Sequence, residues 1–223
     1  MNSEILDRRE PWLQTIQDGL SVAWPICLGY VAIGLAFGVI ARKAGLVPWE
    51  VGLMSIVVYA GSSQFIATAM LGAGAGFFPI VITTFFVNLR HFLMSSSLAI
   101  YLQNIRGGSL ALFAYGITDE SFAVNMNRFR DGKWEWRRAL VVNQVTNLIW
   151  VISTIAGNIG GQFIPARAFG IDYALTAMFI CLLVFQLRGM LYIFVAVIAG
   201  LLAMIVSLAF RGNGYILLAA FIA

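Results

Sequence analysis

Long apolar runs separated by short polar segments make up most of this 223-residue chain. A helix needs about 20 apolar residues to cross roughly 30 Å of hydrocarbon, and it satisfies its own backbone hydrogen bonds there. The pattern therefore predicts an all-α, polytopic transmembrane helix bundle of about seven or eight spans, some of them broken at mid-membrane. The predicted spans are 19–40, 50–71, 77–102, 110–127, 139–157, 173–187 and 189–210. A last run, 214–223, covers only about 15 Å as a helix, so we expect it to be incomplete or to enter the bilayer without crossing.

The composition excludes an ordinary soluble domain. Charged residues make up 11% of the sequence and hydrophobic residues 61%, whereas about a quarter of a soluble domain is charged. Residues 1–18 lack the apolar run and small-residue cleavage site of a secretory signal. We therefore predict a cytoplasmic N-terminal lead-in over 1–18 and one transmembrane domain over 19–223. The net charge of +4 is spread over the connecting segments, which indicates membrane topology rather than a nucleic-acid surface.

Basic residues are unevenly divided between the two faces of the predicted bundle. If the spans alternate in direction, eight Lys and Arg residues lie on the side of the N-terminus and five on the other. Segment 127–138 supplies most of the difference, with five basic residues and two tryptophans. Because Lys and Arg accumulate in cytoplasmic loops and Trp at membrane interfaces, the N-terminus is predicted to be cytoplasmic.

A charged residue lies in the middle of the third apolar run. Arg90 is roughly 18–20 Å along the helix from either end of 77–102, too far for its side chain to reach an interface. A central arginine costs about 2.5–3.5 kcal/mol on insertion scales, so the protein must compensate for it. The next run carries Asp119 and Glu120 near its centre. We predict a buried ion pair between Arg90 and one of these carboxylates.

Polar residues recur at helical spacing in two of the runs. One stripe contains Thr84, Asn88, His91 and Ser95, and the other contains Asn143, Asn147, Trp150, Thr154 and Asn158. Such stripes indicate either hydrogen bonds that hold helices together or a polar cavity, and the sequence leaves both open. The unperturbed pKa of a histidine side chain is about 6.5, so His91 is a candidate for proton transfer at cellular pH. We find no nucleophile–base pair and no set of metal ligands, so neither an enzyme nor a cofactor or metal site is predicted.

The second run contains the stretch YAGSSQF at residues 59–65. Gly61 is a candidate helix break, after which Ser62 or Ser63 is predicted to cap a new half-helix. The start of a half-helix at mid-membrane presents free backbone N–H groups, which suit a substrate carboxylate. The alternative is close packing of small residues against a neighbouring helix. Physical reasoning leaves the two equally open.

Three motifs in order carry a resemblance to a known family: YAGSSQF at 59–65, NLRH at 88–91 and TDESFA at 118–123. They resemble the AzlC/YgaZ family, the large subunit of branched-chain amino acid exporters, and the likeness extends from about Leu20 to the end of the chain. The resemblance implies a secondary transporter of the bacterial inner membrane that exports valine, leucine, isoleucine and methionine. It also implies coupling to the proton motive force and a small hydrophobic partner subunit of the AzlD/YgaH type.

A branched-chain amino acid is a zwitterion with an apolar tail, and the sequence offers a group for each part. We expect the Gly61–Gln64 break, with or without Arg90, to bind the carboxylate, and Asp119 or Glu120 to bind the ammonium or to balance Arg90. Tyr59, Phe65 and Phe92 are predicted to shape the tail pocket. The predicted substrate-binding or pathway residues are Tyr59, Gly61, Ser62, Ser63, Gln64, Phe65, Asn88, Arg90, Asp119, Glu120 and Asn147, and those predicted to couple protons are His91, Asp119 and Glu120.

Other classes of function stay open at this point. A structural or assembly subunit would use the polar stripes for its partner interface. A membrane-embedded enzyme acting on lipid would need clustered catalytic residues near an interface, whereas here the polar set is central. A channel would be distinguished by its rate of conduction.

Overall fold

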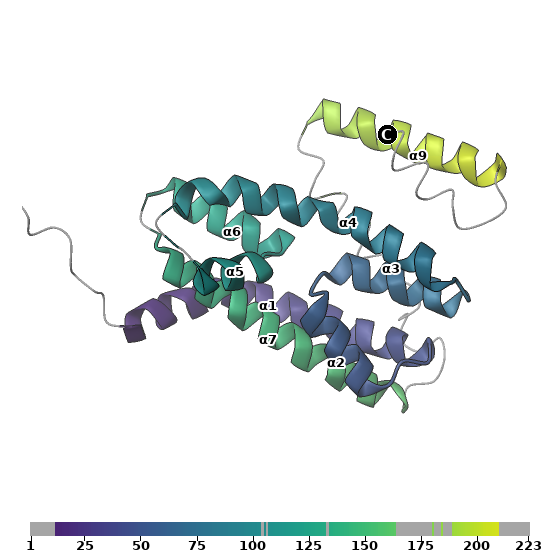
Figure 1. Ribbon diagram of the computed structural model, residues 1–223, viewed down its shortest axis with the longest axis horizontal. Coiled ribbons are helices and arrows are strands. Elements are labelled where there is room, and N and C mark those ends of the chain that lie inside the picture. Colours follow the sequence, from purple (N-terminus) through teal and green to yellow (C-terminus); the bar gives the residue numbers. More distant parts are fainter. Residues whose placement is uncertain are drawn as a thin grey trace, which may run out of the picture.

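The computed structural model describes residues 12–103, 105, 107–132, 134–163, 180, 184 and 189–209. Within these ranges the chain forms helices and no strand, so the predicted all-α bundle is confirmed (Figure 1). Three helices are long and apolar enough to cross a membrane: α1 (Trp12–Lys43), α4 (Phe77–Leu98) with the 3₁₀ turn η1 (Ala99–Tyr101), and α7 (Trp136–Gly161). A further apolar helix, α9, extends from Met190 to Ala209.

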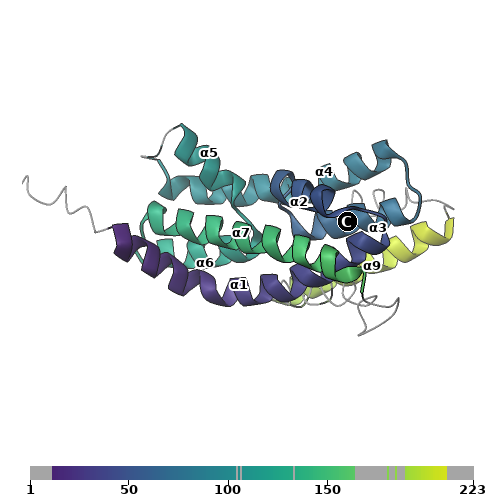
Figure 2. The ribbon, with the colours of Figure 1, turned by 90° about the horizontal axis from the view of Figure 1, so that it is seen from below.

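Helices α1 and α7 lie side by side and run in the same direction (Figure 2). Glycines on both helices allow this close approach. A Cβ atom added at Gly38 would lie 2.2 Å from the Thr154 carbonyl oxygen, and one added at Gly157 would lie 2.2 Å from the Leu35 carbonyl oxygen. Because lipid provides no hydrophobic drive for helices to associate, close backbone packing of small residues is what holds such a pair together. We call the end of the bundle where both helices begin the N-terminal end.

The predicted span 50–71 does not cross the bundle. It is a hairpin of two short helices, α2 (Pro48–Val57) and α3 (Gly61–Gly72), which we call hairpin 1. At the break, Tyr59 has a φ of 39°, a left-handed conformation that reverses the chain. Both open ends lie at the end opposite to the N-terminal end, since a Cβ added at Gly72 would lie 3.8 Å from the Ala44 Cβ, just ahead of α2. Each arm is about 15–18 Å long, which is half the thickness of a bilayer.

The predicted span 110–127 is a hairpin as well. Hairpin 2 consists of α5 (Gly108–Tyr115) and α6 (Asp119–Arg130), with a break at residues 116–118. The ring of Phe129, near the end of α6, stacks on Tyr101 at the end of η1, with centroids 5.1 Å apart. Hairpin 2 therefore enters from the N-terminal end, opposite to hairpin 1, and the two meet at mid-bundle (Figure 1).

Because of these hairpins, the prediction that successive connecting segments alternate between the two faces of the membrane was wrong. The sequence-based count placed the segments on either side of 110–127 at opposite faces of the membrane, whereas the stacked Tyr101 and Phe129 lie at one end. The start of α1 is at this end too, because Asp18 Oδ2 lies 3.2 Å from Arg138 Nη2. Residues 12–18 of the predicted lead-in belong to α1. Predicted span 189–210 corresponds to α9, while most of 173–187 and all of 214–223 lie outside the described residues.

Single-cysteine labelling tests the hairpin topology. After Cys27 and Cys181 are replaced, cysteines at Trp49 and Ala73 are expected to react with a membrane-impermeant thiol reagent from the same side, because hairpin 1 turns back. Cysteines at Ser109 and Asp131 are expected to react from the other side. Right-side-out and inside-out vesicles provide the comparison. Labelling of Trp49→Cys and Ala73→Cys from opposite sides would show instead that 50–71 crosses the membrane.

Candidate functional site

The inner ends of the two hairpins are joined by Arg90, which lies near the middle of α4. Its Nη2 donates a hydrogen bond to the Ser62 hydroxyl in the first turn of α3. Its Nη1 lies 2.9 Å from Asp119 Oδ2, at the first residue of α6. The predicted ion pair between Arg90 and a carboxylate is therefore present with Asp119 as its partner, but it is partly exposed rather than buried. We call this set the Ser62–Arg90–Asp119 bridge.

The start of α3 differs from the predicted capping. Ala60 occupies the N-cap position with φ −142° and forms no side-chain cap, so the prediction that Ser62 or Ser63 caps the helix was wrong. Both serines lie one or two residues inside α3, and their hydroxyls bond to α4 instead. The Ser63 hydroxyl donates to Asn88 Oδ1. The break at Gly61 is confirmed, and the first-turn N–H groups of α3, which have no partner within the helix, have no side-chain cap either.

The start of α6 is built in a different way. Thr118 is the N-cap, and its side chain accepts a hydrogen bond from the Ser121 amide while the Ser121 hydroxyl accepts one from the Thr118 amide. Asp119 and Glu120 lie in the first turn, where negative charge is favoured by the helix dipole. The cap provides a hydrogen-bond acceptor for a first-turn amide, and the two carboxylates balance the positive end of the helix dipole. This helix start is therefore stabilised by its own residues.

Tyr30 on α1 contacts the start of α6 in hairpin 2. The sequence analysis did not identify it as a site residue. Its hydroxyl oxygen lies 2.8 Å from Thr118 Oγ1 and 2.7 Å from Glu120 Oε2. The side chain is 6% exposed, so this contact is shielded from solvent. The sequence did contain a signal, because Tyr30 is the only hydroxyl-bearing residue between 22 and 43.

The charges at the bridge are asymmetric. The first turn of α3 has no charged side chain, whereas the first turn of α6 has two carboxylates, with one guanidinium between the two helices. The side chains of Arg90 and Asp119 are 28% and 32% exposed, so a small molecule has access to them. Arg90 Nε is buried and has no hydrogen-bond partner among the described residues. One guanidinium donor is thus enclosed by the protein without an acceptor among the described residues.

Two other predicted site residues, Gln64 and Tyr59, are used in packing. Gln64 is fully buried, where its Nε2 donates to the Ser55 hydroxyl at 3.0 Å and its Oε1 accepts from Trp150 Nε1 at 2.9 Å. The Tyr59 hydroxyl lies 3.2 Å from Thr146 Oγ1. The contact with Ser55 joins the two arms of hairpin 1, and those with Trp150 and Thr146 attach the hairpin to α7.

The predicted aromatic tail pocket is not assembled. Phe65 is fully buried and packs edge-on against Phe37, with ring centroids 5.0 Å apart. Phe92 is 70% exposed on the outer face of α4. Phe92 follows Arg90 by two residues, about 200° around the helix, so its ring points away from the bridge. Phe65 and Phe92 therefore do not line a common pocket.

The polar stripe of α7 holds the two hairpins. Asn143 Nδ2 donates to the Phe113 carbonyl of α5 at 3.1 Å, and Asn158 Nδ2 donates to the Leu46 carbonyl ahead of α2 at 3.0 Å. Asn147 Nδ2 donates to the Tyr115 hydroxyl at 3.2 Å. Of the two interpretations left open by the sequence, hydrogen bonds between helices describe this stripe.

His91 lies beside the bridge without joining it. Its Nδ1 lies 3.3 Å from the Asn88 carbonyl oxygen, and the residue is partly exposed. Within the described ranges, no three His, Cys, Asp or Glu side chains gather as metal ligands would.

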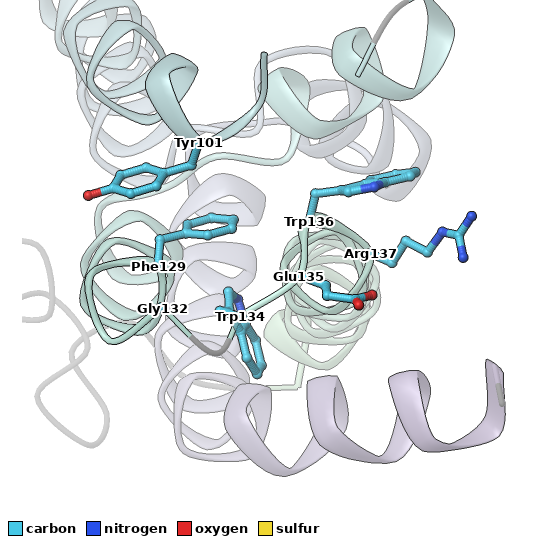
Figure 3. Close-up of a pocket in the computed structure, with 7 residues that line it drawn as sticks. All are labelled: Tyr101, Phe129, Gly132, Trp134, Glu135, Trp136 and Arg137. Carbon is cyan, nitrogen blue, oxygen red and sulfur yellow. The ribbon is translucent and has the colours of Figure 1, made fainter. Parts of the chain in front are cut away.

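A hollow of about 710 Å³ lies elsewhere, at the N-terminal end (Figure 3). Tyr101 is eleven residues beyond Arg90, about 16 Å along the helix, so this hollow is separate from the bridge. Arg128 and Arg138 lie over the Trp134 ring, 5.6 and 5.9 Å from its centroid, an aromatic and basic combination typical of a membrane interface. The residues that line the hollow are Tyr101, Phe129, Gly132, Trp134, Glu135, Trp136 and Arg137.

Comparisons with known proteins agree with the motifs. The family model described as AzlC protein matches residues 25–164, which include α4, α7 and both hairpins. The chain is 30% identical to the inner membrane protein YgaZ of Escherichia coli, over 86% of this chain and 82% of the relative. It is 27% identical to the branched-chain amino acid transport protein AzlC of Bacillus subtilis, over 83% of this chain and 77% of the relative. An uncharacterised membrane protein of Helicobacter pylori is 28% identical over 95% of this chain and 92% of the relative. No solved structure matches the chain.

Replacing Asp119 with Asn tests how much the ion pair contributes to the stability of the protein. The variant is expected to lose about 2–3 kcal/mol of stability, because Arg90 keeps its charge and loses its counter-charge. The double variant with Arg90→Gln should recover much of that loss. Thermal unfolding of the purified protein measures both effects. The matched control is Asp131→Asn, an exposed acid at the end of α6. An Asp119→Asn variant as stable as this control would contradict the prediction.

Proposed function

Because this chain belongs to the AzlC family, we propose that it is a secondary transporter that exports branched-chain amino acids across the bacterial inner membrane. Valine, leucine, isoleucine and methionine are the proposed substrates. The observation that carries the proposal is the Ser62–Arg90–Asp119 bridge, a charged cluster at mid-bundle between two half-helices. Discontinuous helices with polar groups at the membrane midplane are typical of substrate sites in secondary transporters.

The proposed site matches the two charges of the substrate. The substrate carboxylate would accept hydrogen bonds from the uncapped start of α3 and from the partly exposed guanidinium of Arg90. The ammonium group would bind the carboxylates of Glu120 and Asp119 at the start of α6. Charge-assisted hydrogen bonds of this kind are strong and directional. They fix the orientation of the zwitterion, while the tail needs only apolar surroundings.

Coupling to the proton motive force is part of the proposal. His91 is the proposed proton carrier, because it is partly exposed and lies next to Arg90, with Asp119 and Glu120 as the alternatives. One elementary charge that crosses the membrane is worth about 2.3 kcal/mol per 100 mV. Since the substrate is a net-neutral zwitterion, one proton per cycle suffices for more than a tenfold gradient.

We further propose a small hydrophobic partner of the AzlD/YgaH type. Only 11% of the apolar stretch of α4 is buried, compared with 39% in α1 and in α7, so the described residues leave most of the apolar surface of α4 uncovered. The N-terminal end is proposed to be cytoplasmic. In the described part of the chain, this end carries Arg128, Arg130, Arg137 and Arg138, whereas the opposite ends of α1 and α7 carry Arg42 and Lys43, and basic residues favour the cytoplasmic side.

Export of labelled valine from preloaded cells tests the function. Cells that express this chain with its small partner are expected to lose valine faster than cells without the chain, and an uncoupler should abolish the difference. Arg90→Gln and Ser62→Ala are expected to slow export at least tenfold, because each removes part of the bridge. The control is Ser96→Ala, whose hydroxyl bonds only to its own helix at the Phe92 carbonyl. Equal efflux with and without the chain would exclude an exporter and favour an assembly subunit.

Removing the imidazole tests the proton route separately. His91→Ala is expected to abolish proton-driven valine export while leaving valine binding within about twofold, because His91 does not touch the bridge. Export measured across pH 5.5–8.5 in wild type and variant provides the readout. If the variant keeps the pH dependence of the wild type, the proton uses another residue.

A further inference from the structure

The two halves of the helical core have matching boundaries. α1 ends at Lys43 and η1 at Tyr101; α2 ends at Val57 and α5 at Tyr115; α3 occupies Gly61–Gly72 and α6 Asp119–Arg130. Each pair of boundaries is displaced by 58 residues. The breaks at 58–60 and 116–118 have equal length, and α3 and α6 both contain 12 residues. These four boundaries share one displacement, and only the starts of α2 and α5, 60 residues apart, depart from it; together they indicate a single unit used twice.

The two units run in opposite directions through the bundle. In each unit, one long helix is followed by a hairpin that returns from the end where that helix finishes (Figure 1). The first hairpin enters from the end opposite to the N-terminal end, and the second enters from the N-terminal end. Inverted repeats of this kind are common in transporters, with the site at the interface between the repeats.

The contacts between the two units are equivalent as well. Tyr30 on the long helix of the first unit bonds to Thr118 and Glu120 at the start of α6. Asn88, 58 residues later on the long helix of the second unit, bonds to Ser63 at the start of α3. Each long helix therefore contacts the inner end of the other unit's hairpin from the same position of its own unit, although the contacted residues differ, because Ser63 corresponds to Ser121.

We infer that residues 30–72 and 88–130 are two inverted copies of one unit, and that Tyr30 is a positioning residue that holds Glu120 at the start of hairpin 2 as Asn88 holds Ser63 at the start of hairpin 1. This inference rests on the proposed function, because it assigns Glu120 to the ammonium end of the same site. By the 58-residue displacement, Gly61 and Ser62 correspond to Asp119 and Glu120, and Ala32 corresponds to Arg90. A symmetric backbone thus carries an asymmetric set of charges, which gives a zwitterion one preferred orientation.

The hydroxyl of Tyr30 has a specific effect on the charge balance. It engages Glu120 Oε2 at 2.7 Å, while Arg90 pairs with Asp119. Without that hydroxyl, Glu120 is free to turn toward Arg90 and compete with both Asp119 and the substrate carboxylate. The expected defect is therefore in substrate binding rather than in the transport step.

The test is a double-mutant cycle on purified protein together with its partner. Tyr30→Phe is expected to raise the valine KM about tenfold with little change in maximal rate, as loss of one hydrogen bond to a charged group would. Glu120→Gln should raise KM as well, and the double variant should be no worse than Glu120→Gln alone, because the hydroxyl acts through that carboxylate. Asn88→Ala, at the equivalent position, should raise KM in the same way. Tyr101→Phe is the control, because it keeps the ring stack with Phe129.

Thermal unfolding of the same variants distinguishes a failure of the proposed function from a failure of the positioning role of Tyr30. If the protein neither binds nor exports valine, the proposed function fails, while non-additive stability losses of Tyr30→Phe and Glu120→Gln would still support the positioning contact. If valine is transported but the KM effects of these two variants are additive, or Tyr30→Phe behaves as Tyr101→Phe does, the inference is overturned.

Discussion

A guanidinium at the midpoint of α4 must be neutralised within the protein, because it is too far from either end of the helix to reach water. Arg90 meets this requirement by bonding to Ser62 of one hairpin and Asp119 of the other. The starts of α3 and α6 are thereby joined at one place in the middle of the bundle. Most of the architecture serves this arrangement, since α1 and α7 provide the surface on which both hairpins rest.

The hairpins also explain why so many polar residues of α7 are buried. A hairpin that ends at mid-membrane leaves carbonyl groups exposed at its break and its base, and buried carbonyls need donors. Asn143 and Asn158 supply donors to Phe113 and Leu46. Amide side chains in this helix are therefore a requirement of the interrupted backbone, independent of any ligand.

Sequence patterns predicted the elements that depend on local chemistry. The apolar runs predicted helices, a central arginine required an acidic partner on the neighbouring segment, and Gly61 marked a break. The patterns did not predict that 50–71 and 110–127 turn back, because apolar content is the same for a crossing helix and for a hairpin of two half-helices. The turn at Tyr59 has a positive φ, which residues other than glycine rarely adopt. It is held by the contact with Thr146, 87 residues away, which local sequence does not reveal. Tyr30 was missed for a similar reason, since its role comes from a helix start that lies far along the chain.

The half-length of the hairpins has an electrical consequence. Each hairpin is about as long as one leaflet is thick, so the charged groups at the inner ends lie near the middle of the bilayer. A charge that moves within the membrane exchanges energy with the transmembrane potential, about 2.3 kcal/mol for one elementary charge carried across 100 mV. A charge displaced beside Arg90 therefore moves within this field. Short movements of these hairpins are thereby coupled to the membrane field without any helix having to slide across the bilayer.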